Sequence, residues 1–141
     1  MFADLQMTAT NLAVLLCGFA AGGSWVSLVI VPNEAFDNMD YTRADRHIRY
    51  VLKTASTFIA GALMAASALA VLGGAFGAGA VSALAAFGFF TNRWTLSKRA
   101  SPSAPPGTRQ KKKSQRIVAI ALSLMFGLAA IAAGIMAVFR I

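Results

Sequence analysis

Three long stretches of the chain contain no charged residue, and polar segments separate them. The first stretch, 12–32, would form a helix about 31 Å long, which is one crossing of the hydrocarbon core of a bilayer. The last stretch, 117–139, has a similar length and ends directly before Arg140. We therefore expect membrane-spanning helices at about 10–32 and 117–139.

The middle uncharged stretch, 54–92, is too long for one crossing. A single straight helix over it would measure about 58 Å, nearly twice the hydrocarbon thickness of about 30 Å. Glycines are densest between Gly73 and Gly79, and glycine adopts the left-handed conformations of a tight turn without steric cost. The pattern predicts a hairpin with helices at about 54–72 and 78–97, which brings the total to four.

The first polar segment, 33–53, is expected to begin a helix. Thr42 and Asp45 have the spacing of a capping box, so a helix should start near Thr42 and continue into the membrane. The apolar side of this helix would be formed by Ile48, Val51 and Leu52. Pro32 precedes the segment, and a proline there should kink or stop the first helix.

The second polar segment, 98–116, is basic and rich in proline and serine. Its prolines exclude a continuous helix, and the composition predicts a flexible surface loop. The cations that this loop could present to anionic lipid headgroups are Arg109, Lys111, Lys112, Lys113 and Arg116. Each cation near a charged bilayer surface contributes about 1 kcal/mol. No aromatic residues are interleaved with them, so a nucleic-acid partner is not expected.

Composition and charge agree with this pattern. The chain is 57% hydrophobic and only 13% charged, whereas soluble domains are about 25% charged. Of the 13 Lys and Arg residues, only Arg140 lies outside the two polar segments and the end of the third span. The positive-inside rule then places both basic loops in the cytoplasm and both termini outside. We expect one all-α domain over 1–141, a bundle of four transmembrane helices.

Small residues recur at helical spacing in three of the predicted spans. The first span contains Gly18 and Gly22, and the second contains Gly61, followed by Ala65 and Ala68. The fourth span contains Gly127, Ala130 and Gly134. Helices in lipid associate by close packing of such residues, so we expect these stripes to face the bundle interior and the large apolar side chains to face lipid.

Residues that could perform chemistry are few. The spans hold no acidic or basic side chain at mid-depth, which argues against a proton pump, an ion-coupled transporter or a metalloenzyme. Cys17 and His47 are the single cysteine and the single histidine, so we expect no disulfide, metal site or cofactor. Trp25, His47 and Asn92 are candidates for ligand contacts. The alternatives are packing or lipid contact for Trp25, and a solvated interfacial position for His47.

Several short pieces of the chain resemble one known family. They are Gly18 and Gly22 through Ser27, the pair Val31-Pro32, an arginine-rich approach to the second span, and the segment 91–96 around Asn92. This layout is similar to the anthrone-oxygenase-like family of small four-helix membrane proteins. The chain lacks the proline usual before that asparagine, and its third loop is a basic proline-rich segment. The resemblance implies a cofactor-independent oxygenase or a hydrophobic-ligand-binding protein, but it supplies no catalytic residue.

Two hypotheses of function follow. The first is a non-catalytic accessory or assembly subunit that docks onto other membrane protein subunits, in a bacterial inner membrane or alternatively an organellar inner membrane. The second is the oxygenase or ligand-binding protein that the resemblance implies. A buried cavity beside Trp25 with His47 or Asn92 pointing into it would favour the second, and a solid core would favour the first.

Overall fold

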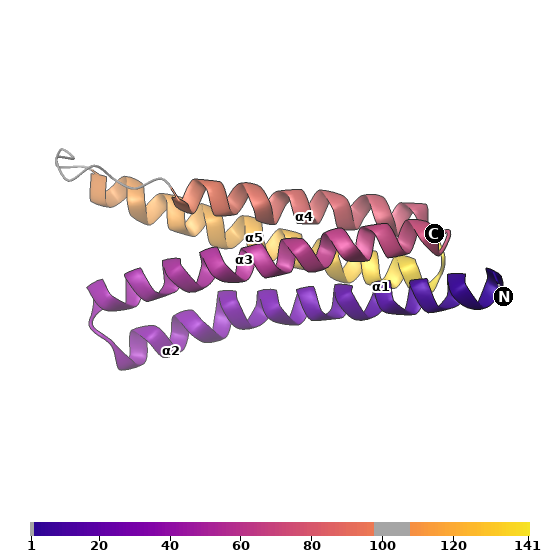
Figure 1. Cartoon of the computed structure of the whole chain (residues 1–141). Coiled ribbons are helices and arrows are strands. Elements are labelled where there is room, and N and C mark those ends of the chain that lie inside the picture. The colour runs from indigo at the N-terminus through magenta and orange to yellow at the C-terminus, as the bar shows by residue number, and fades with distance from the viewer. Residues whose placement is uncertain (1, 98–107) are drawn as a thin grey trace.

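The computed structural model describes residues 2–97 and 108–141, with the side chains of Asn92, 94–97 and 108–116 outside that description. Its elements are α1 (Phe2–Trp25), the π-helical segment η1 (Val26–Ile30), α2 (Val31–Asn38), α3 (Tyr41–Leu72), α4 (Phe76–Ser97) and α5 (Thr108–Val138). Figure 1 shows the helices side by side, with both ends of the chain at the same end of the bundle. The predicted all-α fold is confirmed for the described residues.

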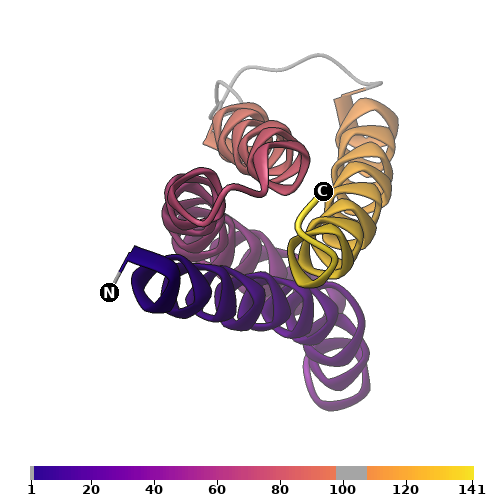
Figure 2. The same ribbon diagram turned by 90° about the vertical axis from the view of Figure 1, so that its right-hand side faces the viewer.

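The four long helices form a ring in which each contacts two neighbours. α1 packs against α3 and α5, and α4 packs against the same two helices, as the end-on view in Figure 2 shows. The interior is filled largely by alanine, together with a few larger side chains such as Ile59, Leu63 and Phe89. Small core residues allow the helix axes to approach closely, which is how helices pack in a membrane.

Helix length and composition fit a bilayer. The segments Phe2–Asn38, Tyr41–Leu72 and Ile117–Val138 are each long and apolar enough to cross a membrane. In their most apolar windows only 28%, 33% and 33% of the residues are buried, so most of the apolar surface faces outward and requires lipid as its solvent. The fourth apolar segment, Phe76–Thr91, is shorter. The helix itself continues to Ser97, so its backbone extends over about 33 Å, enough to cross the hydrocarbon.

The turn between α3 and α4 lies where the glycine cluster predicts it. Gly74 has φ 84°, the left-handed conformation that glycine tolerates. The Ala75 N–H donates to the Ala70 carbonyl at 2.8 Å and the Gly74 N–H to the Val71 carbonyl at 3.0 Å, which together form a Schellman motif. The turn also contacts the first helix, because a Cβ on Gly73 would overlap the Thr10 hydroxyl.

Of the two expected effects of Pro32, a kink or a stop, the stop does not occur. α1, η1 and α2 follow one another without a break to Asn38. The Val31 N–H donates to the Val26 carbonyl five residues earlier, and this wider π turn absorbs the irregularity before the proline. Pro32 lies in the first turn of α2, directly after this π turn.

The predicted capping box is also absent. α3 begins at Tyr41, and the N-cap residue is Asp40, which makes no side-chain capping bond. Thr42 therefore lies inside the first turn, and the Asp45 carboxylate accepts a hydrogen bond from Arg49 Nε at 3.0 Å instead. The expected continuation of this helix from the polar segment into the apolar stretch is confirmed.

The last helix begins earlier than expected. α5 starts at Thr108, inside the segment 98–116 that the composition assigned to a loop. The prolines of that segment end at Pro106, and the lysine, arginine and glutamine residues that follow are good helix formers. The part of the expected loop from 98 to 107 lies outside the described residues.

Candidate functional site

Polar side chains buried in the described part of the bundle are all hydroxyls. They are Thr10, Ser24, Ser27, Ser56, Ser82 and Ser123. No carboxylate, amine, guanidinium or imidazole is buried among the described residues. The interior can therefore donate and accept hydrogen bonds, but it contributes no charged group.

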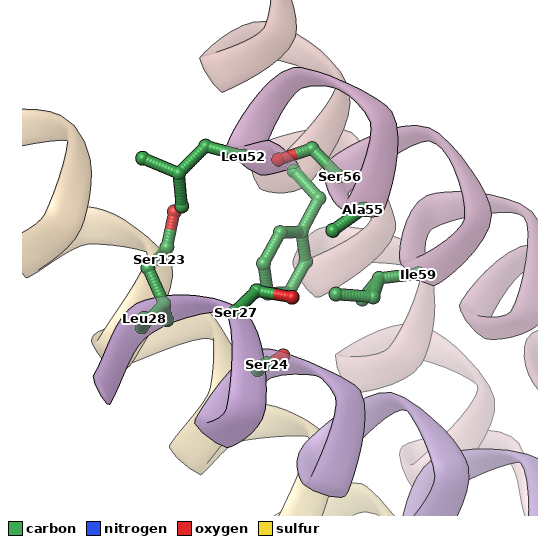
Figure 3. Close-up of a pocket in the computed structure, with 9 residues that line it drawn as sticks. Ser24, Ser27, Leu28, Leu52, Ala55, Ser56, Ile59 and Ser123 are labelled. Atoms are coloured by element: carbon green, nitrogen blue, oxygen red, sulfur yellow. The ribbon is translucent and has the colours of Figure 1, made fainter. Parts of the chain in front are cut away.

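Four of these serines surround one small cavity. Figure 3 shows Ser24 and Ser27 from the first helical rod, Ser56 from α3 and Ser123 from α5 around a common space. The rest of the wall is apolar and consists of Leu28, Leu52, Ala55, Ile59 and Phe89. The cavity measures about 10 Å³, which is about the room that one water molecule needs.

The serines are placed by helical bonding as well as by packing. Ser24 Oγ donates to the Ala20 carbonyl at 2.6 Å, and Ser27 Oγ donates to the Gly23 carbonyl at 2.8 Å. Such bonds to the preceding turn are usual for hydroxyls in membrane helices, and they leave the oxygens able to accept from a water molecule. The cavity wall holds no base that could activate a serine as a nucleophile, so its chemistry is that of a neutral hydrogen-bonding site.

Two glycines bring α1 and α5 together around this interior. A Cβ on Gly127 would lie 3.2 Å from Ser24 Cβ, and one on Gly134 would lie 3.3 Å from Cys17 Cβ. Cys17 Sγ in turn lies 3.6 Å from Ser82 Oγ of α4. The small-residue stripe of the fourth span therefore faces inward, as the sequence pattern suggested.

The other two stripes face outward, which differs from the expectation. A Cβ on Gly18, Gly22 or Gly61 would meet nothing within 4 Å, and all three glycines are exposed. Ala65 and Ala68 on α3 are exposed as well. For α3 the cause is visible in the core. The face of α3 opposite to the stripe carries larger side chains, such as Ile59 and Leu63, and these fill the core.

Two of the three predicted ligand-contact residues, Trp25 and His47, lie apart from the serine cavity. The Trp25 side chain is 60% exposed, and His47 is exposed near the start of α3. Neither residue lines the serine cavity. At the position of Trp25 it is the preceding residue, Ser24, whose side chain is buried and faces the cavity. Asn92 belongs to α4, but its side chain lies outside the described part of the structure.

The predicted headgroup residues, Arg109, Lys111, Lys112, Lys113 and Arg116, belong to the first turns of α5. Figure 1 places this part of α5 at the end of the bundle where α2 and α3 are connected. Their side chains lie outside the described part, so the lipid contacts expected for them stay a prediction.

The serine cavity is the feature that sequence reasoning missed. Each serine is visible in the sequence as a hydroxyl within a span, but no spacing links residues of three different helices. Comparison of the chain with family models, curated proteins and solved structures found no match.

Proposed function

We propose that this small membrane protein is a non-catalytic accessory or assembly subunit of a membrane complex, located in a bacterial inner membrane. The observation that carries the proposal is the exposed small-residue stripe of α3, made by Gly61, Ala65 and Ala68. Among the described residues, nothing lies within 4 Å of a Cβ built on Gly61. Small residues let a second helix approach the backbone closely, whereas contact with lipid alone gains little from them.

The outer face of α1 has the same character. Gly18 and Gly22 are exposed one helical turn apart, and a Cβ on either would meet nothing within 4 Å. Glycine lowers the stability of a helix by about 1 kcal/mol relative to alanine. A partner helix packed on these positions would offset that loss, so α1 and α3 are the helices on which we expect partner subunits to dock.

The serine-lined cavity is too small to be the site of the oxygenase hypothesis. The serine-lined cavity, at about 10 Å³, is far smaller than the roughly 300–1,000 Å³ of typical small-molecule sites. An aromatic substrate of an oxygenase would not fit there. The oxygenase hypothesis expects a buried cavity beside Trp25 with His47 pointing into it. Trp25 and His47 are both exposed, so neither residue meets that expectation.

The experiment is purification of the tagged protein in gentle detergent, with quantitative mass spectrometry of co-purifying proteins. Specific membrane subunits should accompany the wild type, and Gly61→Leu and Gly22→Leu should reduce their yield about tenfold, which corresponds to about 1.4 kcal/mol. Ala132→Leu, at an exposed position of α5, is the matched control and should retain them. A wild-type monomer that carries a bound aromatic molecule would overturn the proposal in favour of the oxygenase hypothesis.

The predicted orientation needs its own test. Single cysteines are introduced at Ala3 or at Asp40, between α2 and α3, in a Cys17→Ser background. A membrane-impermeant maleimide applied to intact cells should label the cysteine at position 3 and spare the one at position 40. The reverse labelling pattern would show that the basic loops lie outside.

A further inference from the structure

We propose that a groove between α1 and the end of α5 binds one anionic phospholipid, with its phosphate at Arg140. The groove measures about 300 Å³ and is lined by Met7, Thr10, Asn11, Val14, Val138 and Arg140. It lies at the end of the bundle that holds both chain ends (Figure 1), away from the basic segment of α5. The inference does not depend on the role proposed above for the outer faces of α1 and α3.

Polar and apolar residues of the groove follow one another along its two helices. Asn11 lies three residues before Val14 on α1, and Arg140 directly follows the uncharged stretch of the fourth span. Val14 lies one helical turn deeper than Asn11, and Val138 precedes Arg140 on the membrane side. A phosphate at the mouth and an acyl chain along the valines would match this order of polar and apolar surface.

Charge favours an anionic lipid at this end. Arg140 is the only lysine or arginine between residue 117 and residue 141, and residues 1–42 contain neither. Asp4 is the one carboxylate in residues 1–33, and it does not line the groove. A guanidinium offers several N–H donors in a planar fork, which suits the oxygens of a phosphate.

The backbone of Arg140 adopts a conformation in which glycine would be more favourable. With φ 56°, Arg140 is the one described residue other than glycine in the left-handed conformation. It ends α5 in a Schellman motif, in which the Arg140 N–H donates to the Ala137 carbonyl at 3.1 Å and the Ile141 N–H to the Met136 carbonyl at 3.0 Å. Glycine is the favoured residue at that position. An arginine in this conformation is less favourable than glycine, so the residue is not the one that helix capping alone would select.

The test is a titration of the detergent-purified full chain with palmitoyl-oleoyl phosphatidylglycerol, with bound lipids counted by native mass spectrometry. The first lipid should bind about tenfold more weakly to Arg140→Gln, because a charged hydrogen bond is lost. Lys53→Gln removes an exposed cation near the opposite end and should change binding less than about twofold. Equal losses in the two variants would mean that only overall charge matters and would overturn the proposal.

A second pair of variants tests the apolar wall. Val138→Trp fills the groove without changing its charge and should weaken binding as much as Arg140→Gln does. Leu128→Trp is the control, because Leu128 is 67% exposed on the same helix and lies outside the groove. If inorganic phosphate displaces the lipid while Val138→Trp has no effect, the groove binds a free anion and the lipid assignment is wrong.

A third variant separates binding from helix capping. Arg140→Gly places the favoured residue in the left-handed position, so the melting temperature in lipid-free detergent should hold or rise while lipid binding is lost. A fall in melting temperature with lipid binding unchanged would show that Arg140 acts only on the negative end of the α5 helix dipole.

Discussion

Gly127 of α5 and Gly61 of α3 occupy similar positions in the sequence, each at the start of a stripe of small residues within an apolar helix. In the bundle they differ completely. Gly127 is buried against Ser24, whereas a Cβ on Gly61 would meet nothing within 4 Å. Small-residue spacing therefore identifies a face that a second helix can approach. Whether the partner is in the same chain depends on how each helix is rotated about its axis.

Exchange of both glycines for leucine tests this difference most directly. Gly127→Leu forces a four-carbon side chain into the contact between α1 and α5, so we expect a loss of about 3 kcal/mol in the free energy of unfolding. Gly61→Leu should change it by less than about 0.5 kcal/mol. Unfolding in mixed micelles by increasing dodecyl sulfate measures both values. Similar losses in the two variants would mean that α3 packs differently.

A smaller effect is expected at the contact between α3 and α4. A Cβ on Gly79 would lie 2.7 Å from Val71 Cγ2 and 3.3 Å from the Ser67 carbonyl oxygen. The Ser67 hydroxyl also donates to the Gly79 carbonyl at 2.8 Å, which holds the two backbones together. We expect Gly79→Ala to destabilise the bundle by about 2 kcal/mol in the same assay. An unchanged stability would show that the two helices can separate without cost.

The buried and exposed hydroxyls of α3 extend the comparison to polar groups. Ser56 lines the interior cavity, whereas Thr57 is exposed and donates to the Lys53 carbonyl at 3.1 Å. Ser56→Ala should cost about 1 kcal/mol through loss of a hydrogen bond to a cavity water, and Thr57→Ala should cost less than about 0.5 kcal/mol. A more stable Ser56→Ala protein would mean that the cavity holds no water.

The smallest effect is expected on the outer face of α1. Gly18→Ala adds a methyl group that meets nothing within 4 Å and raises helix propensity. Its free energy of unfolding should stay within about 0.5 kcal/mol of the wild type or rise. A marked loss of stability in the isolated protein would place Gly18 in a contact within the bundle.

The helices and the hairpin could be predicted because they depend on local properties. The uncharged stretch 54–92 is too long for one crossing, and the glycines beside Gly74 mark the position where it must turn. The apolar side of α3 could be predicted from the spacing of Ile48 and Leu52, which are both buried, whereas the capping box that placed its start near Thr42 is not formed. Such features require only helix length, periodicity and turn chemistry.

Other features depended on contacts between distant segments. The cavity needs Ser24, Ser56 and Ser123 on three helices to point toward one space, and sequence spacing does not encode helix rotation. The groove needs the end of α5 beside Asn11 of α1. The early start of α5 was missed because proline-rich composition outweighed the helix formers that follow Pro106.

The π-helical segment η1 makes the first rod tolerant of a change in its own length. A π turn uses more residues than an α turn, so Val26–Ile30 accommodates roughly one residue beyond the α-helical count. Deletion of one residue there would restore a regular α-helix and leave the helix beyond it close to its present orientation. Ala35 would then stay beside Ala44 and Ile48, with which it forms a buried cluster. A deletion elsewhere in α1, where no π turn absorbs it, would instead rotate α2 by about 100° relative to the preceding part of the rod.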